Sequence, residues 1–221
     1  KRAQKCGHKN TLMTEKLTIV DYGLGNLHSI QKALEFVGAK TVFDKDGTAI
    51  LDSEKVLLPG VGAFAEGMKR LKSRQQLKPI IKYAASGKPL LGICLGCQML
   101  LSSSDEFGDA DGLGLIPGKV IKIPKTEEAI PHIGWKTLKL RSSLFCENFP
   151  FASITEGVWT YFIHSYHAMP EEDKHICATC EYGESEVTAI ISKKNVFGFQ
   201  FHPEKSGEAG LEMLRDFIKL S

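Results

Sequence analysis

The segment Gly92-Ile93-Cys94-Leu95-Gly96 sets the tightest limit on how the surrounding chain folds. An apolar run at 89–94 precedes it, and a helical pattern at 96–101 follows it. A cysteine between two glycines, where a strand passes into a helix, predicts a strained turn in which neighbouring Cβ atoms would collide. We therefore expect Cys94 to be exposed at a strand end, where the helix N–H groups lower the thiol pKa and stabilise an oxyanion.

Short apolar runs and helical patterns alternate through the first half of the chain. Strands are predicted at 16–21, 41–43, 55–58 and 89–94. A helix between the first two strands begins after Asn26, a capping residue, and stops at Gly38, and a longer helical stretch runs through Leu71 to Tyr83. This alternation predicts an α/β fold in three layers, a mostly parallel sheet flanked by helices.

The second half reads as closely spaced strands joined by Gly, Asn and Pro turns. We expect strands at 119–123, 159–166, 175–180, 187–192 and 196–201. A final helix at 207–220 turns Leu211, Leu214 and Ile218 inward. The parallel sheet is therefore expected to carry an antiparallel strand extension. No repeat or linker divides the chain, and we expect one domain at 16–221.

Charge and hydropathy exclude two classes of protein. The net charge is +2, but residues 1–12 hold four basic residues and no acid, and the remaining chain carries 24 basic and 26 acidic residues. A nucleic-acid binder needs a basic face, which this pattern does not provide. No apolar run approaches the roughly 20 residues that span a bilayer. The polar segment 1–15 is expected to be a disordered tail or the remnant of a leader.

Six cysteines, at 6, 94, 97, 146, 177 and 180, do not indicate a disulfide framework in a chain of this length. We expect reduced thiols and a cytoplasmic location. The pairs Cys94/Cys97 and Cys177/Cys180 also match zinc spacing. A zinc site would consume Cys94, and residues i and i+3 of a strand face opposite sides, so no metal is expected. Cys97 is interpreted as a small core residue that forms a disulfide with Cys94 under oxidation, as a hypothesis.

A base for the thiol is predicted at the end of the last strand, in Phe201-His202-Pro203-Glu204. Proline keeps His202 out of the helical region. In an extended chain, His202 and Glu204 face the same side, so the carboxylate can orient the imidazole. The sequence therefore predicts a nucleophile, a base and an orienting acid in Cys94, His202 and Glu204.

At these residues the chain resembles the class I glutamine amidotransferases, from about Leu17 to the C-terminal helix. Finer motifs are similar to the glutaminase subunits of imidazole glycerol phosphate synthase, in histidine biosynthesis: Asp21–Asn26, Pro59–Phe64, Gly112–Gly118, Pro131–Trp135, His164–Tyr166 and His202–Ser206. The resemblance implies that Cys94 attacks the side-chain amide of glutamine, that a glutamyl thioester forms, and that ammonia leaves. His202 then shuttles protons while Glu204 holds it, and no cofactor is implied.

The resemblance also implies roles for residues around the triad. The oxyanion is met by the N–H of Leu95 and by an N–H of the glycine-rich loop Gly60, Val61 and Gly62, whose peptides can flip. Glutamine's amino-acid end is bound by Gln98, Glu106, Ser165 and Tyr166. Ammonia passes to a (β/α)₈ cyclase in a heterodimer, which docks on Asn26, Trp135 and Lys205. An exposed Trp near a Lys is a typical interface anchor.

Three alternatives remain open at this point. Cys97 stands where the family usually has Met, and His167 follows His-Ser-Tyr, which leaves a paralogue that aminates bacterial surface sugars. Complementation of growth without histidine separates the two. A non-catalytic regulatory module on the same fold is a second alternative, because fold does not settle function. A thiol hydrolase or peptidase is the third, and glutamate and ammonia release distinguishes it.

Overall fold

The computed structural model describes residues 16–141 and 149–221. The predicted tail at 1–15, including Cys6, and the cysteine at 146 lie outside the described residues. No helix in the described ranges is long and apolar enough to cross a membrane.

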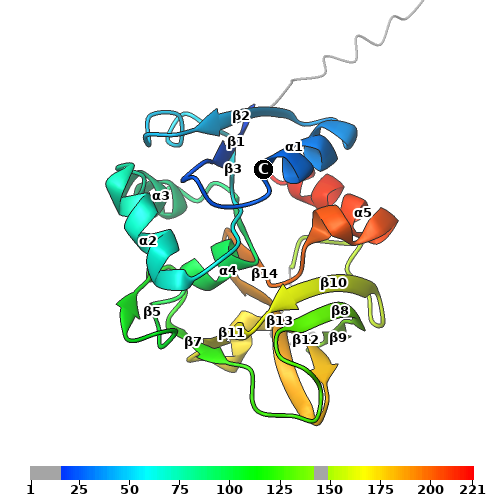
Figure 1. The fold of residues 1–221 in the computed structure, drawn as a ribbon. Coiled ribbons are helices and arrows are strands. Elements are labelled where there is room, and N and C mark those ends of the chain that lie inside the picture. Colours follow the sequence, from blue (N-terminus) through cyan, green and yellow to red (C-terminus); the bar gives the residue numbers. More distant parts are fainter. Residues whose placement is uncertain (1–15, 142–148) are drawn as a thin grey trace, which may run out of the picture.

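A central sheet of eight strands runs through the described part of the chain (Figure 1). Its order is β2 (Lys40–Asp44), β1 (Lys16–Val20), β3 (Lys55–Leu58), β4 (Leu90–Ile93), β14 (Val196–Phe199), β13 (Ser185–Lys193), β12 (Ile176–Tyr182) and β9 (Lys139–Leu140). The five strands from β2 to β14 pair in parallel, and the pairs from β14 to β9 are antiparallel. The predicted mostly parallel sheet with an antiparallel extension is confirmed.

Helices cover both faces of this sheet and give three layers (Figure 1). One face packs against α1 (Leu27–Phe36) and α5 (Gly207–Lys219), and the other packs against α2 (Phe64–Ser73), α3 (Leu77–Ala85) and the short α4 (Leu95–Met99). Each face has its own buried apolar cluster. Asn26 caps α1, because its Oδ1 accepts a hydrogen bond from the Ser29 N–H at 3.3 Å, as predicted.

Two smaller sheets lie beside the C-terminal half of the central sheet. One pairs β10 (Trp159–His164) with β8 (His132–Thr137), and the other has the order β11 (Tyr166–Pro170), β7 (Gly118–Lys122), β5 (Ser103–Ser104) and β6 (Ala110–Asp111). The single strand predicted at 159–166 is therefore wrong. The chain leaves one sheet and enters another at Ser165, and both flanking segments have strand-like patterns.

The single helical stretch predicted from Leu71 to Tyr83 is also wrong. The chain breaks between α2 and α3, where Gln75 has a φ of 58°. Tertiary contacts favour the break, since Gln76 Nε2 donates to the Asp44 carbonyl oxygen at 2.9 Å and carboxylate at 2.8 Å. Arg74 donates to the Asp21 carbonyl oxygen at 2.6 Å.

The buried face of α5 is centred on other residues than those predicted. Met213, Leu214 and Phe217 are fully buried, whereas Leu211 and Ile218 are half-buried at the edge of the cluster. Short 3₁₀ turns η1 (Asp173–His175) and η2 (Pro203–Lys205) precede β12 and α5.

The register of the parallel strands places three loops at one edge of the sheet. Gly92 of β4 pairs with Leu58 of β3 and with Gly198 of β14. The residues that follow these three strands therefore emerge side by side at their carboxyl ends, which is where open α/β sheets bind ligands.

Candidate active site

Cys94 occupies the turn between β4 and α4 in a conformation that few residues adopt. Its φ is 53° and its ψ is −109°, and such backbone costs on the order of 1–3 kcal/mol. The turn is held by its surroundings, because the Cys94 N–H donates to the Phe199 carbonyl oxygen at 2.7 Å. The predicted strained elbow is confirmed. The expectation that Cys94 is exposed is wrong: only 6% of its surface is exposed, because β10 and the residue after β14 pack against the sulfur.

The two glycines of the elbow are required by space. A Cβ on Gly96 would lie 1.8 Å from the carbonyl oxygen of Leu58, and a Cβ on Gly92 would lie 2.6 Å from that of Gly96. Both neighbours are backbone atoms, which cannot move away without deforming the sheet. The predicted reason for these glycines, that no Cβ fits, is confirmed.

His202 and Glu204 form the predicted contact, although the local geometry differs from the prediction. His202 itself is extended, with φ −101° and ψ 98°, but Pro203–Lys205 is a 3₁₀ turn rather than extended chain. The turn brings Glu204 Oε1 to 2.8 Å from His202 Nδ1. Both side chains are at least 95% buried, so the carboxylate fixes the ring and leaves Nε2 for another partner.

The environment of His202 favours its protonated form. Burial by itself lowers the pKa, but hydrogen bonds with the Cys94 sulfur and the Glu204 carboxylate, together with their charges, raise the pKa to about 10. At neutral pH the imidazole is therefore a cation between a sulfur and a carboxylate. This arrangement suits a thiolate–imidazolium pair.

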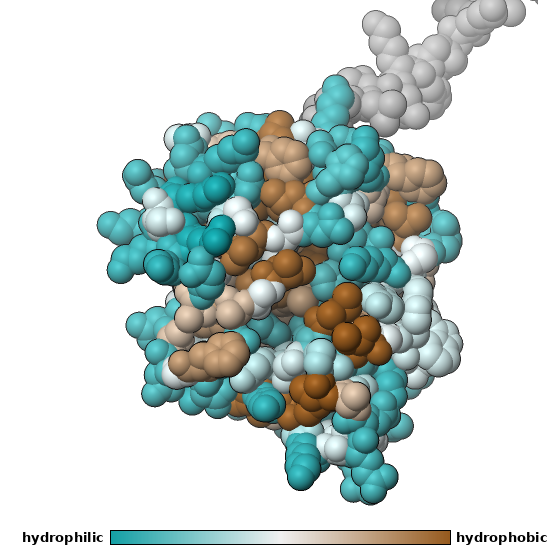
Figure 2. Space-filling model, in the orientation of Figure 1, coloured by the Kyte–Doolittle hydropathy of each residue, from teal (hydrophilic) through white to brown (hydrophobic). Residues whose placement is uncertain are grey.

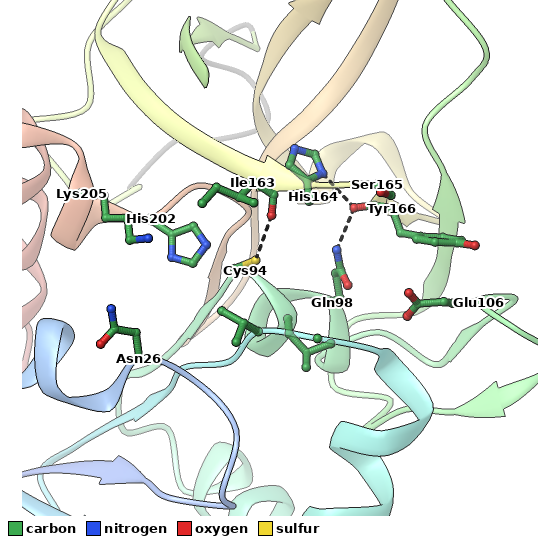
Figure 3. A pocket seen from close by; sticks show the side chains of 13 residues that line it. Asn26, Cys94, Gln98, Glu106, Ile163, His164, Ser165, Tyr166, His202 and Lys205 are labelled. Carbon is green, nitrogen blue, oxygen red and sulfur yellow. Dashed lines mark hydrogen bonds between the residues drawn. The ribbon is translucent and has the colours of Figure 1, made fainter. Parts of the chain in front are cut away.

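Cys94 and His202 open into a cavity of about 240 Å³ (Figure 3). Its wall includes the residues predicted for substrate, loop and partner contacts: Asn26, Val61, Gly62, Leu95, Gln98, Glu106, Ser165, Tyr166 and Lys205. Gly60 lines a smaller neighbouring cavity. Trp135 stands apart from both on β8, 46% exposed.

Two of the predicted substrate residues are held in fixed orientations. The Gln98 amide nitrogen donates to the Tyr166 carbonyl oxygen at 2.7 Å and to Gln200 Oε1 at 3.1 Å. Glu106 Oε2 accepts from the Phe64 N–H at the start of α2 at 2.7 Å. The cavity therefore presents an amide carbonyl oxygen and a carboxylate, which together suit an ammonium group.

The predicted oxyanion donors are not assembled in this state of the chain. The Leu95 N–H donates to the Gly60 carbonyl oxygen at 3.3 Å. The loop is held on its other side by Tyr22, whose hydroxyl donates to the Pro59 carbonyl oxygen at 2.8 Å. An oxyanion can reach the Leu95 N–H only after the Gly60–Val61 peptide turns away.

Two of the three predicted partner residues line the cavity. Asn26, the residue that caps α1, and Lys205 of η2 reach it (Figure 3). Trp135 packs edge-on against Tyr161, with ring centroids 5.7 Å apart. Since the Tyr161 carbonyl oxygen accepts from the His202 N–H at 2.9 Å, this aromatic surface adjoins the segment that carries His202.

The two cysteine pairs lie in different elements, one at the start of α4 and the other in β12. Cys94 belongs to the apolar cluster on one face of the sheet and Cys97 to the cluster on the other. Burial, together with the nearby Cys94, holds the pKa of Cys97 well above its ordinary value, which disfavours the proposed disulfide. Cys177 and Cys180 are buried in β12. Within the described ranges, no group of three His, Cys, Asp or Glu side chains is arranged to hold a metal ion.

Sequence reasoning missed Tyr22 and Gln200, which contact the Pro59 carbonyl oxygen and the Cys94 sulfur. Gln200 had a usable signal, because it precedes His202 by two residues in an extended segment and so faces the same side. Tyr22 had no signal in the sequence alone, since its contact with Pro59 depends on the order of the strands.

Known proteins similar to this chain share both its sequence pattern and its fold. The family model described as glutamine amidotransferase class-I matches residues 18–220. "Imidazole glycerol phosphate synthase subunit HisH" of Listeria monocytogenes is 46% identical over 207 residues, covering 93% of this chain and 96% of its own. The protein of the same name from Geobacter sulfurreducens is 43% identical over 208 residues, covering 91% and 97%. A chain of the PurLQS structure from Thermotoga maritima has a TM-score of 0.72 at 22% identity, covering 93% and 98%.

Proposed function

This chain belongs to the class I glutamine amidotransferases, among the glutaminase subunits of imidazole glycerol phosphate synthase, and from that premise we propose that Cys94, His202 and Glu204 are its catalytic triad. The chain hydrolyses glutamine to glutamate and ammonia in histidine biosynthesis. The single observation that carries the triad is the buried His202–Glu204 contact at 2.8 Å, whose imidazole lines one cavity together with Cys94 at the end of the sheet.

The proposed reaction begins with attack of the Cys94 thiolate on the amide carbon of glutamine. The carbonyl oxygen takes the negative charge, and the imidazolium of His202 gives its proton to the amide nitrogen. Ammonia leaves as the C–N bond breaks, and a glutamyl thioester remains. His202, now neutral, takes a proton from water, whose oxygen attacks the thioester and releases glutamate and the thiolate.

Gln98 and Glu106 are proposed to bind the α-ammonium group of glutamine. Both nitrogen-bound hydrogens of Gln98 are engaged, so its oxygen is the group left for the substrate. The backbone N–H of Phe64 fixes one Glu106 oxygen, and the other is available to the cavity. Ser165 and Tyr166 lie at the break between β10 and β11 and are proposed to contact the same end of the substrate.

Partner binding is proposed to open the oxyanion hole. The loop Gly60–Gly62 lies in the same mouth as the predicted docking residues Asn26 and Lys205. A subunit seated there reaches the loop directly, and rotation of the Gly60–Val61 peptide frees the Leu95 N–H and turns a second N–H inward. The isolated chain is therefore expected to turn over glutamine slowly.

The partner is proposed to be a (β/α)₈ cyclase subunit that receives the ammonia and forms imidazole glycerol phosphate. The outer face of the β8–β10 pair supports this docking surface. Apolar and aromatic side chains cover it beside the cavity: Ile133, Trp135, Trp159, Tyr161 and Ile163. Figure 2 shows apolar atoms gathered across the middle of this side of the molecule. Desolvated aromatic anchors of this kind dominate binding energies at interfaces.

Ammonia release by the complex tests the proposal. The chain and its cyclase subunit are mixed with glutamine, and glutamate and ammonia are measured with and without Cys94→Ala. We expect loss of at least about a thousand-fold, as for other lost nucleophiles. Cys180→Ala, which removes a buried thiol in β12, is the matched control and keeps activity. Equal rates for Cys94→Ala and the wild type would reject the triad.

The histidine pathway is favoured over the surface-sugar paralogue by the names of the relatives at 43–46% identity. Complementation decides between them. In a strain that lacks its own glutaminase subunit, this chain and its cyclase are expected to restore growth without histidine. Failure to do so, while glutamine hydrolysis is retained, would favour the sugar pathway.

A further inference from the structure

Gln200 is a completely buried polar side chain that the proposed triad does not use. It directly follows β14, next to the elbow that directly follows β4. Its amide nitrogen donates to the Cys94 sulfur at 3.9 Å, and its amide oxygen accepts from Gln98 Nε2 at 3.1 Å. Gln200 therefore connects the nucleophile to a side chain proposed to bind the substrate.

The orientation of the Gln200 amide follows from its neighbours. One hydrogen of Gln98 Nε2 goes to the Tyr166 carbonyl oxygen, which can only accept. The same nitrogen then has its second hydrogen for Gln200, so the oxygen of Gln200 must face Gln98. The NH₂ group of Gln200 is left to face the sulfur, because the reverse orientation sets two donors against each other.

A second contact of the sulfur acts in the opposite sense. When Cys94 is protonated, its Sγ donates to the Ile163 carbonyl oxygen at 3.8 Å. A carbonyl oxygen repels a thiolate, whereas an N–H donor attracts it. Hydrogen bonds to charged acceptors are strong, and more so where water is excluded.

We propose that Gln200 stabilises Cys94 as a thiolate and aims it at the substrate amide, and that Gln98 keeps Gln200 in the orientation this requires. The inference rests on the proposed function, since it assigns a role within the same site. When glutamine binds, its ammonium group donates a hydrogen bond to the Gln98 oxygen. This polarises the Gln98 amide, and the polarisation passes through the Gln200 amide to the sulfur. Substrate recognition and activation of the nucleophile are thereby connected.

Other titratable groups lie near this sulfur or line the same cavity, and the test holds them constant. They are Tyr22 from the end of β1, Cys97 on α4, His164 on β10, His202 before η2, and the pocket residues Glu106 and Lys205. Glu204 acts through His202. Because none of them is altered in a Gln200 variant, a difference from the wild type reports the amide alone.

The test measures the rate at which iodoacetamide alkylates Cys94 as a function of pH, with mass spectrometry of the peptide that contains it. The full chain is used, alone and with the cyclase subunit. In Gln200→Met, which keeps the size and loses the donor, the midpoint for thiolate formation is expected to rise by about one pH unit, a roughly ten-fold slower alkylation below the midpoint. Gln200→Glu keeps the acceptor for Gln98 but places a carboxyl beside the sulfur, and the rise is expected to be at least as large.

Gln76→Met is the matched control. Gln76 is equally buried, and its amide donates to Asp44 at the far edge of the sheet. The Gln76→Met variant is expected to have a lower melting temperature but the same pH midpoint for thiolate formation as the wild type. Midpoints in both Gln200 variants that equal the wild-type value would overturn the inference, and if Gln200→Met does not fold, Gln200→Glu alone decides. A wild-type complex that alkylates normally but releases no ammonia would instead reject the proposed function.

Discussion

His202 is charged in the folded chain well above the pH at which a free imidazole loses its proton. Its pKa is raised to about 10 because the interactions with Cys94 and Glu204 outweigh the opposing effect of burial. In the unfolded chain the value returns to about 6.5. A raised pKa stabilises the folded state fully below the unfolded value, and the contribution disappears as pH rises through the folded value.

The free energy of unfolding is therefore expected to fall between about pH 6.5 and pH 10 because of His202. In Glu204→Gln, the imidazolium loses its carboxylate, the pKa of His202 is less raised, and this fall is expected to be smaller. Urea denaturation at a series of pH values measures it. Glu35→Gln, the same change at an exposed ion pair on α1, serves as the control and parallels the wild type. Parallel curves for Glu204→Gln and the wild type would contradict the argument.

Single residues were predictable where the chemistry is encoded in neighbouring positions. The strained elbow at Cys94 was predicted from its flanking glycines, and the contact of His202 with Glu204 from their separation of two residues. Gln200 was missed because its role depends on a contact with Gln98, which is distant in sequence and close in space. The contact between His202 and Glu204 was predicted for an incomplete reason, since a turn and not an extended chain makes it.

The loop from Pro59 to Gly62 is held at its first two carbonyl oxygens. Tyr22 fixes the Pro59 carbonyl oxygen, and the Leu95 N–H holds the Gly60 carbonyl oxygen. Glycine is required at two positions of this loop for different physical reasons. Gly60 has no room for a side chain, since a Cβ would lie 1.9 Å from the Tyr22 hydroxyl, whereas Gly62 has open space but a φ of 104°.

These two glycines are expected to respond differently to alanine. Gly60→Ala collides with a fully buried tyrosine and is expected to cost about 3 kcal/mol or more of stability. Gly62→Ala is strained only in its backbone and is expected to cost about 1–2 kcal/mol. In the double variant Tyr22→Phe/Gly60→Ala, loss of the hydroxyl is expected to recover part of the first cost. Chemical denaturation of all three measures this, and equal costs for the single variants would contradict the steric account.

Helices and strands were predicted well where a single hydropathy pattern corresponds to a single segment of secondary structure. The strands before and after the elbow were found because continuous apolar runs end in glycine or proline. The break between α2 and α3 was missed, because Gln75 and Gln76 are ordinary helix formers and the reason to stop lies in Asp44. The break at Ser165 was missed because a change of sheet leaves no mark on local hydropathy.

On the scale of the whole molecule, the cavity mouth and the β8–β10 face form one continuous side. Ile163 belongs to both, since it lines the cavity and pairs with Ile133 on the outer face. A partner that covers this side also closes the route by which ammonia would escape to water. The class of fold was predictable from the alternation of strands and helices, but the position of this face was not, because β8 was not recognised as a strand.

Trp135→Ala is expected to weaken binding of the cyclase subunit by about thirty-fold or more, as for a central aromatic anchor. Phe36→Ala is the control, because Phe36 is 68% exposed at the far end of α1 from Asn26. Titration calorimetry measures both affinities. Alkylation of Cys94 in the free chain is expected to be unchanged by either substitution. Equal affinities for the two variants would place the interface elsewhere.

The Gly60 carbonyl oxygen has a kinetic consequence. In the proposed mechanism it competes with the reacting oxygen for the Leu95 N–H. Because it belongs to the same chain, no excess of glutamine can displace it by mass action. Saturating the free chain with glutamine would leave its maximal rate low. Glutamine can fill the cavity while the hydrogen-bond donor for the reacting oxygen stays unavailable. Under the proposed mechanism, glutamine supply alone therefore does not set ammonia output, and binding of the second subunit does.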